Sequence, residues 1–163
     1  MLTQDATALP GGGWRVGVIM KPVRLAAAVG ATLVLIACAG PGGVAKPQVQ
    51  VKIAGTIVPA AMGSYCWSSG GQGQCVDMAS MHAVAQTRGL TPTHVLAASP
   101  GTITFDRYPR SLDLMAGSDE AHLQAVPMDA MSFQAPSTPG VWEYLLSGRW
   151  DQGDVTWVFL ISV

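Results

Sequence analysis

Residues 141–163 place the strongest constraint on the fold, because large apolar side chains recur at alternate positions there over two consecutive runs. Such alternation is typical of half-buried β-strands. Between the runs, Asp151-Gln152-Gly153-Asp154 predicts a hairpin turn. We therefore expect a C-terminal β-hairpin with one apolar face, formed by Trp142, Tyr144, Leu146, Trp150, Val155, Trp157, Phe159, Ile161 and Val163. The opposite face of its first strand carries Glu143, Ser147 and Arg149.

Shorter runs of the same kind occur earlier in the chain, separated by turns that contain glycine or proline. They are residues 48–53, 56–58, 93–97 and 102–106, the alternation at 111–114, and short runs around Leu123 and Phe133. Several short strands with turns between them are typical of a β-sandwich. The sequence thus predicts an all-β domain over residues 48–163, an antiparallel immunoglobulin-like β-sandwich with one short helix.

The helix is expected between Met78 and Arg88, where the spacing changes from two to three or four residues. Asp77 is placed as its N-cap and Gly89 as the residue that ends it. The side chains that share one face of this helix are Met78, Met81, His82 and Ala85. A methionine-rich stripe of this kind is more typical of packing against a core than of a cofactor site.

The N-terminal region has the pattern of a secretory signal. Lys21 and Arg24 precede an apolar run of 13 residues, Leu25–Ala37. A helix that spans a bilayer needs roughly 20 residues, so a permanent transmembrane helix is not expected. We take residues 1–37 as the signal peptide and Met20 as the expected start of translation; the alternative is a long segment before the apolar run.

The signal ends in Leu35-Ile36-Ala37-Cys38, which resembles the lipobox of bacterial lipoproteins. The resemblance implies that Cys38 receives a diacylglyceryl group and becomes the N-terminus after cleavage, so that the protein is anchored to the outer, extracytoplasmic face of the cell membrane. The alternative is an ordinary buried helix with a buried cysteine. Residues 38–47 are rich in glycine and proline and are expected to form a flexible tether.

Cys66 and Cys75 remain as a pair in the exported part of the chain. In an oxidising compartment, two cysteines this close predict a disulfide. A zinc site needs further ligands at short spacing, and a redox-active pair normally has two residues between its cysteines. We therefore expect a disulfide that joins the two flanks of a glycine-rich loop at 68–74.

Two motifs together resemble a family of small secreted proteins and lipoproteins of Gram-positive bacteria. The first is Gly63-Ser64-Tyr65-Cys66-Trp67 followed by Cys75-Val76-Asp77. The second is the ending Pro139-Gly140-Val141-Trp142-Glu143-Tyr144, Trp150, Gly153-Asp154 and Trp157-Val158-Phe159. The similarity covers most of residues 48–163. It implies a fold and a location outside the cytoplasm, and no activity.

Charge and motifs exclude several classes of function. After Cys38 the chain has six basic and nine acidic residues, a net charge of −3, without a basic cluster for nucleic acid. There is no P-loop, no dinucleotide fingerprint and no G-x-S-x-G motif. Ser118, Asp119 and His122 are crowded into one polar turn, and the acidic pairs Asp119-Glu120 and Asp151/Asp154 also lie in expected turns. The sequence favours a protein that is not an enzyme. A hydrolase of envelope polymers would need a group of carboxylate or nucleophilic side chains that only the fold brings together.

Soft-metal binding is the main alternative. Thioether and imidazole groups suit copper, and we take Met78, Met81, His82 and His94 as the candidate ligands. The other methionines and histidine of the exported chain are Met62, Met115, Met128, Met131 and His122.

The first hypothesis is a non-catalytic binding module without a cofactor, anchored to the membrane, whose partner is an envelope protein or polymer. Tyr65 and Trp67, beside the 68–74 loop, are the candidate contact residues. Aromatic side chains on a rigid loop provide contact area at a low cost in ordering. The alternative is that both side chains pack on the core of the sandwich beside the disulfide.

Overall fold

The C-terminal hairpin forms the centre of the larger of two sheets, as the alternation predicts. The computed structural model describes residues 45–163. In it β10 (Val141–Trp150) pairs with β11 (Gly153–Ser162) along their whole length, from Trp150 opposite Gly153 to Val141 opposite Ser162. The expected signal peptide, the expected start at Met20 and the expected lipid site Cys38 lie outside the described residues.

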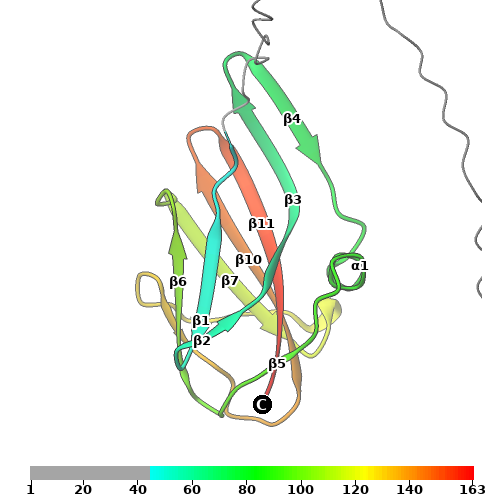
Figure 1. Cartoon of the computed structure of the whole chain (residues 1–163), viewed down its shortest axis with the longest axis vertical. Helices are drawn as coiled ribbons and strands as arrows, with labels where there is room; N and C mark the ends of the chain where they lie inside the picture. Colours follow the sequence, from blue (N-terminus) through cyan, green and yellow to red (C-terminus); the bar gives the residue numbers. More distant parts are fainter. Residues whose placement is uncertain (1–44) are drawn as a thin grey trace, which may run out of the picture. The chain divides into compact units, whose positions relative to one another are not determined.

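The two sheets pack face to face, and the predicted antiparallel β-sandwich is confirmed (Figure 1). The smaller sheet has the order β2-β1-β6-β9 and the larger one β4-β3-β11-β10-β7-β8, with β5 parallel to β11. The remaining strands are β1 (Val49–Ile53), β2 (Thr56–Val58), β3 (Ala60–Ser69), β4 (Gln72–Val76), β5 (Thr93–His94), β6 (Pro100–Phe105), β7 (Ser111–Gly117), β8 (Gln124–Ala125) and β9 (Ser132–Gln134).

The core lies between the sheets and is rich in aromatic side chains. Trp150 makes edge-to-face contacts with Trp67, Phe105 and Trp157, with ring centroids 5.9, 5.5 and 6.0 Å away. At the other end of the core, Tyr144 stacks on Phe159 at 4.5 Å. Aromatic pairs of this kind each add about 0.5–1.5 kcal/mol to what burial alone contributes. The smaller sheet covers these rings with the aliphatic side chains of Val51, Ile53, Val58 and Ile103.

The helix forms, but it begins later than predicted. α1 spans Met81–Thr87, and its N-cap is Ser80, whose hydroxyl accepts a hydrogen bond from the Ala83 amide at 3.0 Å. The prediction of Asp77 as N-cap is therefore wrong, and Met78 precedes the helix. Gly89, at φ 64°, follows the helix in the position expected for it. Glu120–His122 forms a single turn of 3-10 helix. No helix within residues 45–163 has the length and apolar character that crossing a membrane requires.

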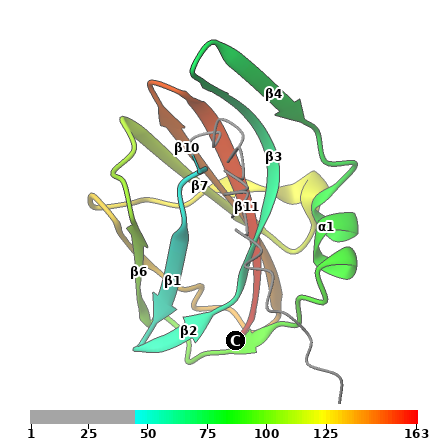
Figure 2. The ribbon, with the colours of Figure 1, turned by 45° about the horizontal axis from the view of Figure 1, so that its top comes forward.

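α1 packs on the outer face of the larger sheet, against β3 and β11 (Figure 2). Met81 and Ala85 are its buried residues, and Met81 is fully buried. Under the helix the outer face of the sheet is also apolar, because Val158 and Leu160 are buried there. Of the methionines in the predicted stripe, Met81 therefore packs the helix against the sheet.

The segment predicted as a glycine-rich loop is a β-hairpin. β3 and β4 pair from Tyr65 opposite Val76 to Ser69 opposite Gln72. Gly70 and Gly71 form the two-residue turn, with φ of 59° and 81°. Glycine adopts positive φ at little cost, and two such residues in succession match the turn that a tight hairpin needs.

The predicted disulfide between Cys66 and Cys75 is confirmed, and it joins directly opposed positions of β3 and β4. A crosslink that closes a loop of about ten residues should stabilise a domain by about 2 kcal/mol, chiefly by restricting the unfolded chain. We expect the double variant Cys66→Ser/Cys75→Ser to lose this amount in equilibrium denaturation while keeping its fold. An unchanged midpoint in the double variant would contradict this expectation.

Candidate functional site

The chain enters the sandwich beside the β3–β4 hairpin. A guanidinium nitrogen of Arg107 donates a hydrogen bond to the Ala45 carbonyl. The Lys46 ammonium lies 4.1 Å from the centre of the Tyr65 ring, and Pro47 is fully buried. Contacts with the domain therefore begin before Gln48, within the segment expected to be a tether.

This entry segment and the hairpin enclose a hollow of about 360 Å³. Its lining is about equally polar and apolar, and Lys46 is its one charged residue. The lining residues are Ala45, Lys46, Trp67, Ser69, Gln72, Gly73 and Gln74. The polar side chains come from the inner face of the hairpin, where Trp67 is paired with Gln74 and Ser69 with Gln72.

The two aromatic residues proposed as contacts have different environments. Trp67 is only 5 % exposed and is part of the core, where it packs against Trp150. The prediction that Trp67 offers an exposed contact surface is therefore wrong, and the packing alternative holds for it. Tyr65 is half-buried at the edge of the core, under Lys46. Tyr65 remains a candidate contact residue.

Trp67 carries an unusual polar group. Its indole N–H is buried and has no hydrogen-bond partner among the described residues. The Arg107 guanidinium lies over its ring at 5.5 Å. A buried donor without a partner costs about 1–3 kcal/mol, so the geometric fit of this ring in the core must outweigh that cost.

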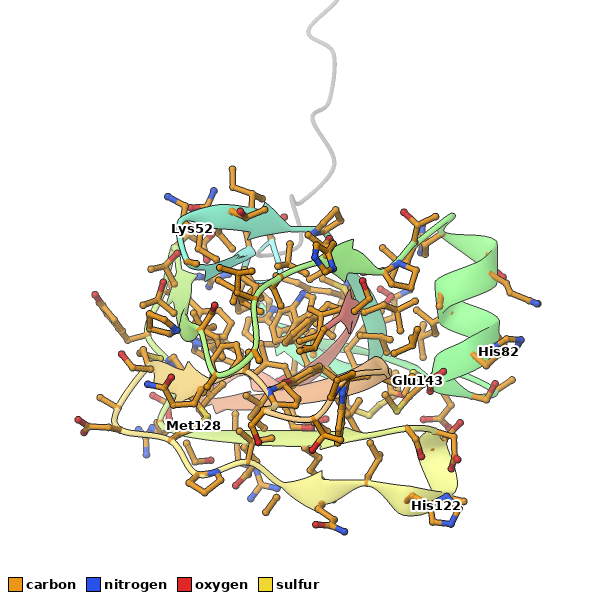
Figure 3. The ribbon with its side chains drawn as sticks, turned by 90° about the horizontal axis from the view of Figure 1, so that it is seen from below. Lys52, His82, His122, Met128 and Glu143 are labelled. Atoms are coloured by element: carbon orange, nitrogen blue, oxygen red, sulfur yellow. A yellow bond between two sulfur atoms is a disulfide. The ribbon has the colours of Figure 1, made fainter. Side chains whose placement is uncertain are left out.

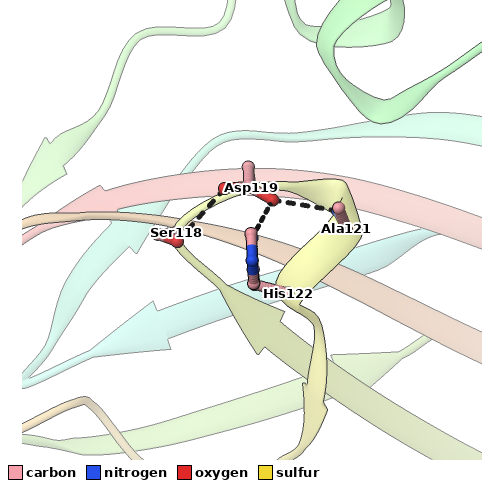
Figure 4. Close-up of polar contacts among 4 residues, drawn as sticks. All are labelled: Ser118, Asp119, Ala121 and His122. Carbon is pink, nitrogen blue, oxygen red and sulfur yellow. Dashed lines mark hydrogen bonds and ion pairs between the residues drawn. The ribbon is translucent and has the colours of Figure 1, made fainter.

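Ser118, Asp119 and His122 lie together but not in the order that nucleophilic catalysis needs (Figure 4). The Asp119 carboxylate lies between the other two, 2.7 Å from His122 Nδ1 and 3.3 Å from the Ser118 hydroxyl, which donates to it. A serine nucleophile requires the histidine next to its hydroxyl, with the carboxylate behind the histidine. Asp119 also accepts a hydrogen bond from the Ala121 amide and caps the 3-10 turn. The cluster is a capped turn.

Two carboxylates near this turn have shifted pKa values. The hydrogen bond from His122 lowers the pKa of Asp119, and the Ala121 amide acts in the same direction. Burial raises the pKa of Glu143 on β10, an effect that His82 opposes. Of the other expected acidic pair, Asp151 lies in the β10–β11 turn and forms an ion pair with Arg110, whereas Asp154 is the second residue of β11 and not a turn residue.

The candidate metal ligands do not form a site of the usual kind. Residues 45–163 contain no group of three or more His, Cys, Asp or Glu side chains placed to hold a metal ion. The fully buried Met81 faces the sheet, and the Met78 sulfur lies against Gly63. His82 is exposed on α1, whereas His94 on β5 lies 3.5 Å from the Ser162 hydroxyl. Figure 3 shows His82 next to Glu143 and far from Met128. The copper alternative gains no support from this arrangement.

Comparison with protein-family models, curated proteins and solved structures finds no match to this chain. The function of the hollow must therefore be inferred from the residues that line it. The sequence alone did not reveal it, because Lys46 lies in a segment whose composition indicates a tether. The one available signal was the Gly70-Gly71 pair, which predicts a hairpin between two runs of strand.

Proposed function

We propose that this protein is a lipid-anchored, extracytoplasmic binding module of the cell envelope that performs no catalysis. One observation carries the proposal: Leu35-Ile36-Ala37-Cys38 directly follows a positively charged segment and an apolar run of 13 residues. A thiol at this position is the group that takes the lipid in bacterial lipoproteins. Two acyl chains hold a protein stably on a membrane, whereas a single chain is marginal.

The disulfide supports export, because such bonds persist in oxidising compartments. The distance to the membrane also fits a module that works close to the surface. From Cys38 to Ala45 the chain has seven residue steps, which reach about 24 Å when fully extended. The chain enters the domain at Lys46, beside the β3–β4 hairpin.

The hollow beside the hairpin supports binding. It offers hydrogen-bonding groups from Ser69, Gln72 and Gln74 and one ammonium group from Lys46, on a strand pair fixed by a disulfide. A rigid surface loses little entropy when it binds. Tyr65, whose ring lies 4.1 Å from the Lys46 ammonium, is the aromatic residue available for contact with an envelope protein or polymer.

The experiment that tests the anchor compares the wild-type protein with Cys38→Ser in cells fed a labelled fatty acid. The wild-type protein should take up the label and sediment with membranes, and protease added outside the cytoplasm should digest it. The variant should lose the label completely and remain unprocessed or soluble. A wild-type protein without label, or a variant with as much label as the wild type, would refute the proposal.

A further inference from the structure

β4 is an edge strand without the usual protection. It ends the strand order of the larger sheet, and within residues 45–163 its only partner is β3 (Figure 1). All five of its residues, Gln-Gly-Gln-Cys-Val, are exposed, and they include no charge and no proline. Natural proteins usually shorten an edge strand or place lysine or proline on it, because a bare edge pairs with other chains. The other edge strands here are shorter: β2 and β9 have three residues and β8 has two.

The free hydrogen-bonding groups of β4 belong to Gly73 and Cys75. The Cα atoms of Cys66 and Cys75 are 4.1 Å apart, the short spacing of a pair that shares no backbone hydrogen bonds. In such a pair each residue directs its own N–H and C=O away from its neighbour. Ser68, opposite Gly73, agrees with this pattern, because its amide donates away from β4, to the Gln152 carbonyl at 2.8 Å. Gly73 and Cys75 therefore direct two N–H and two C=O groups to the outer edge.

This edge is complementary to itself. If a second β4 lies antiparallel with Gln74 opposite Gln74, Gly73 of each copy is opposite Cys75 of the other. Each of these two pairs then exchanges two hydrogen bonds, which gives four in all. Gln72 comes to lie opposite Val76, a side chain that is 41 % exposed in the single chain and would be partly covered. We propose that β4 pairs with β4 of a second copy of this chain, about a two-fold axis at Gln74.

The entry of the chain fits this arrangement. The Lys46 ammonium is 3.5 Å from the Gln74 side-chain oxygen, so the segment that leads to Cys38 leaves the domain beside the proposed axis. Each copy's lipid site then lies within about 24 Å of its own Ala45, measured along seven extended residue steps. Two anchors so placed can enter the same membrane. In this respect the pairing rests on the proposed lipid anchor.

The anchor also explains how so small a contact can form. A contact made by four backbone hydrogen bonds along a five-residue strand buries little surface. A stable protein–protein interface buries at least about 1,200 Å². In dilute solution the pairing should be weak. Confinement on one membrane raises the effective concentration of the copies, and weak contacts then become populated.

Position-specific crosslinking tests the pairing in membranes that contain the full-length protein. In Gln74→Cys the two new thiols face each other across the axis, at the Cα spacing of about 4.5 Å that suits a disulfide. In the matched control Gln72→Cys, on the same face of the same strand, the thiols are about 14 Å apart. Mild oxidation should give a dimer several-fold more abundant at position 74, and peptide mapping should find position 74 joined to itself. Equal yields at both positions, or no dimer at 74, would overturn the proposal.

A second pair of variants tests the backbone hydrogen bonds in the Gln74→Cys background. Gly73→Pro removes an outward N–H and leaves the β3 ladder intact, since that N–H does not face β3. Gly73→Ala keeps the N–H, and its new Cβ would meet its nearest neighbour, Ser68 Cβ, at an ordinary 4.0 Å. Proline should abolish the dimer and alanine should retain it, with both variants folded by their melting curves; an unaffected proline variant would overturn the pairing. Membrane fractionation of the same cells reports on the anchor separately, because an anchored protein without a dimer at 74 contradicts the pairing alone.

Discussion

Trp67→Ala is expected to destabilise the domain by about 3–5 kcal/mol, the range for large-to-small substitutions of buried aromatic residues. The ring is 5 % exposed and lies against Trp150, whose own ring contacts Phe105 and Trp157. Its removal leaves a cavity beside Trp150, which the surrounding strands cannot fill by small movements. Equilibrium denaturation followed by tryptophan fluorescence measures the loss.

Three matched variants separate packing from surface effects. Trp157→Ala, at a residue 3 % exposed, should lose a similar amount. Tyr65→Ala should lose roughly 1 kcal/mol, because Tyr65 is half-buried at the edge of the core. Trp67→Phe should stay within about 1 kcal/mol of the wild type, since it loses some area but also removes an N–H without a partner. A Trp67→Ala variant as stable as the wild type would show that the ring is not part of the core.

The C-terminal hairpin was predictable because its strands are long and large apolar side chains recur at alternate positions along both of them. Each inward position from Trp142 to Val163 is supported by several neighbours of the same kind, so a shift of one residue would expose the whole apolar face. The shorter strands other than β4 were also located, although β5 is shorter than its run. Their ends depend on pairing with other strands, which local sequence does not specify.

The β3–β4 hairpin was predicted as a loop because its sequence has low β propensity. Gly63 is required by tertiary packing: a side chain there would meet the Met78 sulfur at 2.6 Å and the Thr156 hydroxyl at 2.8 Å. The disulfide and the pairing of β3 with β11 hold this segment as a β-hairpin although its local β propensity is low. Local composition therefore failed where long-range contacts decide the structure.

The position of the helix start depends on the same long-range contacts. Asp77 and Ser80 are both good N-cap residues. The Met78 amide donates to the Ser64 hydroxyl at 3.0 Å, which holds this residue against β3 and keeps it out of the helix. The first turn then begins at Met81, whose amide donates to the Glu120 carboxylate at 3.1 Å.

The candidate site was predictable only in part. The disulfide and the region around Tyr65 were identified. That the Trp67 side chain points into the core was not predicted. Successive residues of β3 face the core and the solvent in turn, and the isolated Tyr65-Cys66-Trp67 between serines does not show which of these faces is covered by the second sheet. The contribution of Lys46 requires a fold, because it lies 28 positions from the Gln74 side chain that it contacts.

Gly153→Ala is the second substitution with a large expected effect. Gly153 begins β11 opposite both Trp150 and Trp67, at φ 145°, a conformation that other residues rarely adopt. A Cβ atom there would overlap the backbone carbonyl of Cys66, which cannot move without disturbing the disulfide-linked strand. The strain at positive φ and the steric overlap each cost about 1–3 kcal/mol, so a combined loss of roughly 4 kcal/mol is expected.

Gly55→Ala is the control for this variant, because Gly55 also has positive φ, 83°, but nothing lies within 4 Å of where its Cβ would be. Only the conformational cost applies there, about 1–2 kcal/mol. Urea denaturation of the two variants side by side therefore separates strain from overlap. If Gly153→Ala loses no more than Gly55→Ala, the close approach of β11 to the Cys66 carbonyl is wrong. A much larger loss at Gly153 means that the β3–β4 hairpin is held from both sides, by its disulfide and by the backbone of β11.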